Sequence, residues 1–483
     1  MQLAAPNPLE EPRMQPRSFV TARTPRNLAL AAALAVLAIG LPQHSAAQTI
    51  ISDTEIEDML RDFSDPILRA ADLRPEDVRI HLIADREINA FVTGGQQIFF
   101  HTGLITESET PEELMGVIAH EVGHIAGAHL ARRGEAASAA WAPTLLAIGL
   151  GVLAIAAGAP DAGAALIAGS QQFGFASLIA YNQTQESAAD QAGATFLETA
   201  GISSEGLLKF FENFRYQEVL SNARRFQYFR THPLSSDRIE ALRDRVERSS
   251  YTGYRLNNDE QMRLDMAKAK IIGFLEPPST TYGVYPESDQ SLPARYARAV
   301  ASYRAPDLRR ALALTDALIA EQPENPYFLE LKGQILFEFS QVTNSIAYHE
   351  RAVELAPNKP LLMIALARSL AESPDRKDIP RAVELLEGAI RIEKDNAFAW
   401  GELAKAYDAM GRPGDARLAT AEQAFAVGVS PRAFVFARRS LEHLEAGTPA
   451  WQRAQDIIAL TQPRGGRRDD GPRQRIAPAS PGN

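Results

Sequence analysis

The chain has 483 residues, enough for two or three domains with separate hydrophobic cores. Its formal net charge of -10 argues against nucleic acid as a partner, because no large basic surface is available to neutralise phosphates. The absence of cysteine excludes disulfides and thiolate metal ligands.

Residues 1–47 have the features of a bacterial secretory signal peptide. A segment with several arginines precedes the apolar run 28–41, and small residues follow at positions compatible with cleavage. The run is short for a bilayer span, although an uncleaved anchor remains an alternative. The acidic residues before Met14 are unusual in such a segment, which leaves the start of translation open between Met1 and Met14. We therefore expect an exported protein whose mature chain begins near residue 48.

Alternating apolar residues in the first part of the mature chain predict a small sheet. The segments VRIHLIAD and INAFVTGGQQIFFHTGLI have this pattern, and Gly94 and Gly95 lie between two of the expected strands. A helix is expected next, over residues 112–130.

The segment GVIAHEVGHIAGAHL, residues 116–130, has the spacing of a metal site. His120 and His124 lie four residues apart, so on a helix they project from one face beside Glu121. In the pattern H-E-x-x-H, two imidazoles bind zinc and the glutamate takes a proton from water. His129 is expected on the opposite face and is assigned a structural role. The alternative is a buried helix with satisfied core histidines, but only nine histidines occur in the chain, which favours the metal site.

A catalytic zinc site needs three protein ligands, so a third must come from elsewhere. The metzincin pattern requires a histidine six residues after His124, where this chain has Leu130, and that family is excluded. The later segment YNQTQESAADQAGATFL offers Glu186 as a ligand, and Asp190 as the acceptor for the outer nitrogen of a ligand histidine. A solvated acidic face is the alternative, although the flanking alanines favour a closely packed helix. We expect one zinc ion per chain, held by His120, His124 and Glu186.

A second apolar run covers residues 139–158, interrupted by Pro143 and several glycines. Its length would allow a membrane span, but alanine and glycine make it only weakly hydrophobic. Helices packed near the active site or at a membrane surface are the favoured interpretation.

The C-terminal half has a different pattern. Proline and polar residues over 251–292 predict a linker. From residue 293, small residues recur with a period near 34, which is the tetratricopeptide period. About four helical hairpins are expected over 293–431, with further helices to 461 as a cap and a disordered tail over 462–483. An unrelated helical bundle is the alternative.

Four motifs occur together in one order: NAFVTGG at 89–95, HEVGH at 120–124, ESAAD at 186–190 and THPLSSDRI at 231–239. This combination resembles metallopeptidase family 48, which includes HtpX and the CaaX prenyl proteases. The signal peptide and repeats make the chain most similar to the periplasmic BepA-like branch. The resemblance implies an α+β zincin-like metallopeptidase domain over 48–250, followed by an all-α tetratricopeptide-repeat solenoid over 293–461. That branch carries cysteines and this chain has none, so thiol-based regulation is not expected.

The resemblance also implies a function. The expected protein is a periplasmic zinc metalloendopeptidase that cleaves misfolded or unassembled outer-membrane proteins, with repeats that bind the assembly machinery. Glu121 would act as base and then acid, and the strand over 89–93 would pair with an extended substrate. One alternative is a protease-derived chaperone or scaffold that acts mainly through its repeats. The other is a membrane-embedded CaaX-type protease, which would need several strong spans. Peripheral membrane contact stays open.

His232 is the remaining candidate site residue. Pro233 disfavours helix at His232, so an exposed, movable turn is expected, with Arg238 near enough to orient the histidine or a reacting carbonyl. In the resembled family the matching histidine can occupy the open zinc position, which implies an inhibitory plug. A transition-state donor, or a surface histidine capping a helix that begins near Ser235, are the alternatives.

Overall fold

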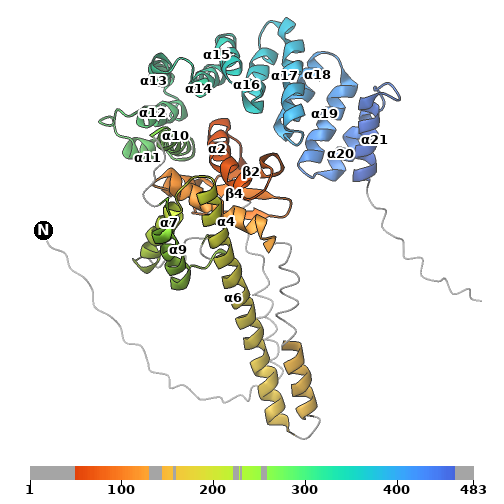
Figure 1. Ribbon diagram of the computed structural model, residues 1–483. Coiled ribbons are helices and arrows are strands. Elements are labelled where there is room, and N and C mark those ends of the chain that lie inside the picture. The colour runs from red at the N-terminus through yellow and green to blue at the C-terminus, as the bar shows by residue number, and fades with distance from the viewer. Residues whose placement is uncertain are drawn as a thin grey trace, which may run out of the picture. The chain divides into compact units, whose positions relative to one another are not determined.

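The computed structural model describes residues 49–129, 144–155, 159–220, 228, 231–251 and 258–462 (Figure 1). The expected signal peptide, the two candidate start residues and the expected tail beyond residue 462 lie outside the described residues.

A four-stranded mixed sheet opens the described chain, with strand order β1-β2-β4-β3. The strands are β1 (Ile50–Ile51), β2 (Arg79–Ile83), β3 (Ala90–Thr93) and β4 (Gln97–His101). β2 and β4 are parallel, whereas β1 and β3 are antiparallel edge strands. Gly95, with φ of +83°, forms the turn between β3 and β4, where a residue without a side chain carries no steric cost. The predicted sheet and its glycine turn are confirmed.

Helices pack on this sheet around one core. They are α2 (Thr54–Ala70), α3 (Thr102–Glu107), α4 (Pro111–Ala126), α6 (Pro160–Thr199), α7 (Glu205–Leu220) and α9 (Ser236–Arg248). Apolar side chains of α2, β4, α4 and α7 are fully buried together, including Leu60, Phe100, Val117 and Leu207. This burial holds α4 at the centre of the domain.

Two glycines let α4 and α6 approach each other. A side chain at Gly123 would lie 2.7 Å from the backbone oxygen of Ala189, and one at Gly193 would lie 2.9 Å from the backbone of Ala119. Atoms at these distances overlap, so only glycine fits at either position. The close contact brings the segment of α6 that contains Glu186 against the HEVGH segment of α4.

The helix α4 ends at Ala126, four residues before the predicted end. Gly127 follows as its C-cap, and Ala128 has a φ of +50°, in the left-handed region that stops a helix. The prediction that His129 lies on the far face of this helix was therefore wrong, because the chain has already turned.

The segment predicted as a linker, 251–292, contains helices α10 (Asn258–Leu275) and α11 (Pro278–Val284). Leu264, Ala267 and Ile271 of α10 are buried in the core of the peptidase domain. Met266 and Ala269 are buried on the side of α10 that faces the repeats. α10 thus contributes to two cores. The prediction of a linker rested on proline and polar residues and missed the apolar residues that α10 buries.

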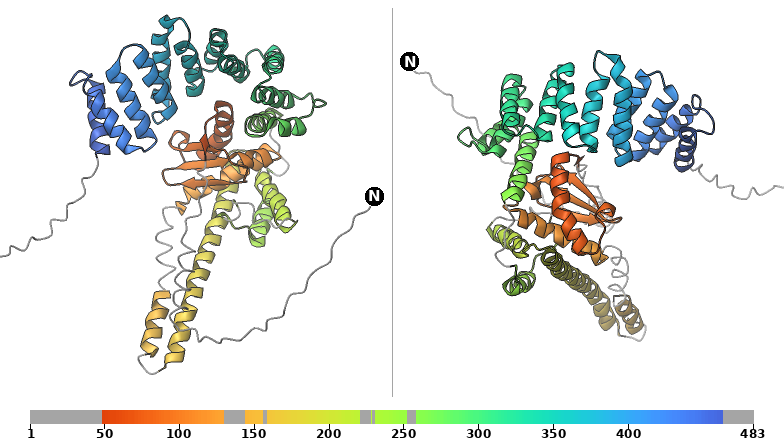
Figure 2. Two further views of the ribbon diagram at one scale, coloured as in Figure 1. Left: turned by 180° about the vertical axis from the view of Figure 1, so that it is seen from behind. Right: turned by 45° about the horizontal axis from the view of Figure 1, so that its top comes forward.

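Antiparallel helix pairs follow, as in a tetratricopeptide solenoid (Figures 1 and 2). The pairs are α12 (Leu292–Arg304) with α13 (Leu308–Glu321), α14 (Pro326–Glu338) with α15 (Val342–Leu355), α16 (Pro360–Ala371) with α17 (Ile379–Ile392), and α18 (Ala397–Ala409) with α19 (Pro413–Ala426). α20 (Ser430–Ser440) and α21 (Pro449–Thr461) end the described chain. Small residues such as Ala311, Ala352 and Ala416 are buried between helices, as the period predicted. The α+β peptidase domain followed by an all-α repeat solenoid is confirmed.

Polar contacts join the start of the peptidase domain to the repeats. The Nζ atom of Lys270 lies 2.8 Å from Asp53 and 3.2 Å from Glu55, and the Tyr296 hydroxyl donates to Glu55 at 2.9 Å. Further along α2, Asp58 accepts hydrogen bonds from Tyr327 and Lys359 in successive repeats. These contacts tie α2 to α10, α12, α14 and α16.

Residues 144–155 form a helix that lies beside the first half of α6 in both views (Figures 1 and 2). Leu145, Leu146 and Leu153 are each about two-thirds exposed. The packed alternative near the active site is therefore wrong for the described part of 139–158. Within the described ranges, no helix combines the length and apolar character needed to cross a membrane.

Candidate metal centre

Four buried side chains converge on one point inside the peptidase domain. They are His120 and His124 from α4, Glu186 from α6 and His232 from the loop before α9. The Nε2 atoms of His120 and His124 lie 3.1 Å apart. The Glu186 carboxylate lies 3.3 Å from the first and 3.4 Å from the second. All four potential ligand atoms lie within 4.8 Å of one another, a spacing that suits a single ion.

Asp190 lies one helical turn after Glu186 and faces the outer nitrogen of His120. Its carboxylate is 2.8 Å from Nδ1 of His120, which directs Nε2 of that histidine to the cluster. Arg238 donates to the same carboxylate from Nε at 2.6 Å and from Nη2 at 2.8 Å. The pair holds Asp190 in place, and Arg238 also lies 3.3 Å from Glu186.

Hydrogen bonds keep the two acidic residues of α6 ionised in spite of burial. Burial alone would raise the pKa of Glu186, but hydrogen bonds from the histidines hold its pKa well below the usual range. Burial likewise opposes ionisation of Asp190, and hydrogen bonds from Arg238 and His120 lower its pKa. Both groups are therefore negative, which suits a ligand and a partner of a ligand histidine.

Glu121 lies in the same cluster but is not placed as a ligand. It is fully buried, and neither of its carboxylate oxygens has a hydrogen-bond partner among the described residues. Nε2 of His232 lies 3.4 Å from its Oε1. An orphaned buried carboxylate is costly unless it receives a further polar group. A water molecule coordinated by a metal ion between His120, His124 and Glu186 would supply that group, so the residues fit a catalytic metal site.

His129 contacts the centre from an unexpected direction. Because the chain turns after Gly127, Nδ1 of His129 lies 2.9 Å from Nδ1 of His124. That contact occupies the outer nitrogen of His124 and leaves Nε2 directed toward the cluster. His129 therefore contacts His124 and does not lie across the helix, and its structural role stays a prediction.

The structure corrects the prediction of an exposed His232. The side chain is only 6% exposed, and its ring stacks on Tyr228 with centroids 4.8 Å apart. Its Nδ1 lies 3.0 Å from Glu186 and 3.2 Å from Nε2 of His120. Pro233 does keep His232 out of a helix, and α9 begins directly after Ser235, as expected. However, Arg238 donates to the Pro233 carbonyl and to Asp190, and not to the histidine ring.

Two residues of the centre were missed or misjudged from sequence. Tyr228 was not considered, since one aromatic residue among several in this segment gives no signal of its contact with a histidine. Arg238 was recognised in the THPLSSDRI motif, but its partner was not. An arginine in such a motif can indicate a buried ion pair. Its partner cannot be predicted here, because Arg238 and Asp190 lie far apart in the sequence.

Comparison with known proteins finds similar metalloproteases. Residues 52–246 match the model of the family described as Peptidase family M48. The chain is 26% identical over 353 residues to the beta-barrel assembly-enhancing protease of Escherichia coli K12, covering 72% of this chain and 70% of that protein. The corresponding protein of Yersinia pestis is 24% identical, covering 75% and 74%. Metalloprotease LoiP of Escherichia coli K12 is 28% identical, covering 36% and 64%.

Among solved structures, the chain is similar to YrrB, described as a TPR protein with an unusual peptide-binding site. The TM-score is 0.30 at 15% identity, covering 36% of this chain and 91% of that chain.

Proposed function

We propose that the chain is a zinc-dependent endopeptidase of the periplasm that acts on misfolded or unassembled outer-membrane proteins. Support comes from the match of residues 52–246 to the model of peptidase family M48 and from the similar metalloproteases. The observation that carries the proposal is the buried cluster of His120, His124 and Glu186 beside the unpartnered Glu121.

The metal would be held by His120, His124 and Glu186, with Asp190 fixing the orientation of the first histidine. A bound zinc ion supplies a Lewis acid that lowers the pKa of water and polarises a peptide carbonyl. Glu121 takes the proton of the attacking water and then delivers it to the leaving amine. Burial excludes bulk water, which strengthens these electrostatic interactions.

The proposed substrate is an extended chain segment. β3 is an edge strand of the sheet and contacts α4, so its free edge can pair with a substrate backbone beside the centre. Unfolded or unassembled proteins expose such segments, whereas folded ones do not. This supports clients that have failed to fold.

The proposed role of the repeats is recruitment of clients or of an outer-membrane assembly machinery. Support comes from the relatives, which are named for assembly of β-barrels and align with far more of the chain than the peptidase domain alone. This extent favours a repeat-bearing protease over a membrane-embedded CaaX-type protease. The complete set of candidate catalytic groups favours a protease over a scaffold alone.

The test is cleavage by the purified mature chain of casein and of an unassembled β-barrel protein kept in solution, compared with the same β-barrel folded in detergent. We expect cleavage of casein and of the unassembled form. Cleavage of the folded β-barrel at an equal rate, or of neither form, would contradict the proposed substrate class.

His232 is proposed to inhibit the resting enzyme, since its ring lies against Glu186, His120 and Glu121 at once. In that position the ring would block the approach of water to Glu121 and to an ion held by the proposed ligands. We expect His232→Ala to raise the basal rate of peptide cleavage about tenfold, equivalent to roughly 1.4 kcal/mol of lost inhibition.

The matched control is His443→Ala, an exposed histidine of the repeats, which should leave the rate unchanged. A lower rate in His232→Ala would identify a transition-state donor instead. Unchanged cleavage of both a peptide and a protein client would contradict both roles.

Peripheral membrane contact is proposed for the helix over 144–155 and the first half of α6. On the helix over 144–155, exposed apolar residues cover every side except the one that contains the buried Thr144 and Gly151, namely Leu145, Leu146, Leu150, Val152, Leu153 and Ile155. A protein partner covers one stripe of a helix, whereas lipid can surround it. Asp161 is the only charged residue of the sequence between Glu135 and Glu186. We call this pair of segments the apolar arm.

We expect the protein to float with neutral phosphatidylcholine vesicles in a density gradient, with no dependence on salt because the arm lacks basic residues. Replacement of Leu145, Leu146 and Leu153 by Ser should abolish flotation, since each leucine loses about 1.5–3 kcal/mol of burial. Leu460→Ser, which changes an equally exposed leucine of α21, is the control. Binding that requires anionic lipid, or that survives the triple substitution, would contradict this contact.

A further inference from the structure

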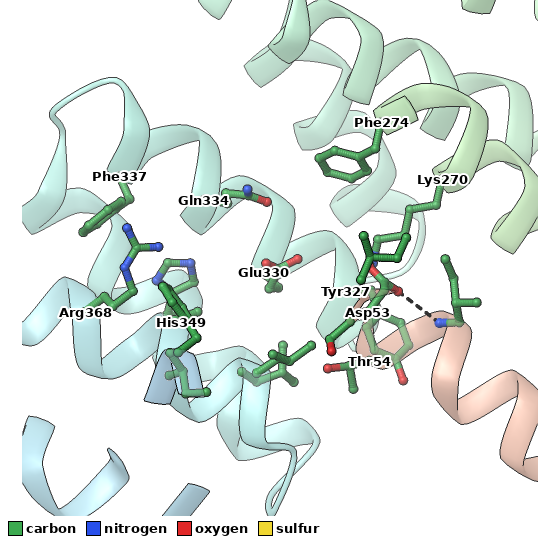
Figure 3. Close-up of a pocket in the computed structure, with 18 of the residues that line it drawn as sticks. Asp53, Thr54, Lys270, Phe274, Tyr327, Glu330, Gln334, Phe337, His349 and Arg368 are labelled. Carbon is green, nitrogen blue, oxygen red and sulfur yellow. Dashed lines mark hydrogen bonds and ion pairs between the residues drawn. The ribbon is translucent and has the colours of Figure 1, made fainter. Parts of the chain in front are cut away.

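A cavity with mostly apolar walls and a few charged side chains lies where the repeats meet the start of the peptidase domain (Figure 3). It has a volume of about 360 Å³. Its walls come from the β1–α2 connection, α10, α14, α15, α16 and Phe398 of α18. We call it the junction pocket. None of the proposed metal ligands lines it, so it can bind a ligand independently of catalysis.

The two cations of the junction pocket differ in their surroundings. Lys270 at one end is neutralised by Asp53 and Glu55. Arg368 lies at the other end, and among the described residues no carboxylate lies within ion-pair distance of it (Figure 3). Its Nε atom is buried and has no hydrogen-bond partner there. A partly buried guanidinium without an acceptor is costly unless a ligand supplies one.

Aromatic rings hold Arg368 in this position. Its guanidinium carbon lies 4.7 Å from the ring centre of Phe337 and 5.5 Å from that of Phe398. Cation–π contacts with two rings stabilise the charge and fix the plane of the guanidinium without using its N–H donors. Those donors stay available for a planar acceptor, and a carboxylate can accept two of them at once. Phe398 itself is 50% exposed and provides an apolar surface beside the charge.

The rest of the pocket suits a peptide. Leu361, Leu362 and Ile364 contribute apolar wall, and Gln334 and Glu330 lie between Arg368 and Lys270 (Figure 3). Burial raises the pKa of Glu330 to about 7, so this group is only partly ionised near neutral pH and does not cancel the charge of Arg368. Gln334 and Glu330 can hydrogen-bond to successive amides of an extended backbone, while the apolar residues accept its side chains.

We propose that the junction pocket binds the C-terminal end of an extended polypeptide, with its terminal carboxylate on Arg368 and an apolar last side chain against Phe337 and Phe398. Arg368 lies at one end of the pocket, so a bound polypeptide that runs past Glu330 and Gln334 would place its C-terminus at Arg368. The ligand would contact both the repeats and the first residues of the peptidase domain, since Ile51, Ser52 and Thr54 line the same cavity.

The test is fluorescence anisotropy with full-length Glu121→Gln protein, which does not cleave the probe, so failure of proteolysis does not affect the result. The probe is an N-terminally labelled peptide that ends in Ala-Val-Leu with a free carboxylate. We expect its C-terminal amide to bind at least about tenfold more weakly, because charge-assisted hydrogen bonds to the guanidinium are lost. Arg368→Gln should weaken binding of the free acid by a similar factor and leave the amide unchanged, whereas Arg368→Lys should lie between.

Arg391→Gln, on the exposed side of α17, is the matched control, and circular dichroism checks that each variant is folded. Equal affinity for acid and amide would overturn the proposal, as would an unchanged affinity in Arg368→Gln. A third peptide, amidated and with aspartate as its penultimate residue, separates a terminal from a side-chain carboxylate. If it binds as tightly as the free acid, the pocket does not recognise a chain end and the proposal is wrong.

Discussion

Glu121→Gln is expected to abolish proteolysis while leaving one zinc ion per chain. Glu121 is buried beside the proposed ligands, and neither of its oxygens accepts a hydrogen bond from the described part of the chain, so its removal takes away the proton acceptor and not the metal. General acid–base groups contribute roughly 10²–10⁴ in rate, and here one group serves in both steps. The measurements are cleavage of casein and metal content by mass spectrometry after gel filtration.

Glu186→Ala should differ from Glu121→Gln in its metal content, because a site with only two protein ligands does not retain zinc through purification. Both metal and activity should be lost. Full zinc occupancy in Glu186→Ala would show that another residue is the third ligand. Glu240→Gln, an exposed glutamate of α9, is the control for both variants.

Asp190→Ala is expected to have the largest effect on stability. Arg238 is only 4% exposed, and Asp190 accepts two of its hydrogen bonds, so the substitution leaves a buried cation whose remaining carboxylate contact among the described residues is Glu186. Removal of one partner from a buried ion pair costs roughly 3–5 kcal/mol. For a domain of this size we expect Tm of the peptidase domain to fall by roughly 10 °C in differential scanning calorimetry.

A chelator separates this effect from loss of metal. If the instability comes from the uncompensated charge of Arg238, the difference in Tm between Asp190→Ala and the unaltered chain persists in EDTA. If it vanishes there, Asp190 acts only through the metal ligand His120. Glu212→Ala, which breaks the exposed pair with Arg243, should leave Tm unchanged.

The sequence by itself was sufficient for features that depend on local spacing. His120 and His124 lie on one face of α4 because four residues make about one helical turn, and Asp190 follows Glu186 on α6 for the same reason. The alternation of strands β2 to β4 and the 34-residue period of the repeats are likewise repeated local patterns. Such patterns survive in a single sequence because each depends on neighbours in the chain.

Only the tertiary structure decided contacts between distant segments. His232 is buried because Tyr228, Glu186 and His120 surround it. The proline that follows it in the sequence predicted only its backbone conformation. The direction of His129 depends on the left-handed backbone of Ala128, which could not be predicted because alanine rarely adopts that conformation. Proline and polar residues predict a linker for the segment containing α10, and only the packed chain shows that this helix belongs to two cores. Arg368 gave no signal at all, since a charge without a partner can be recognised only when every neighbour is known. Burial and hydrogen-bond partners are properties of the packed chain, and they determine which polar side chains of this protein are available for catalysis or binding.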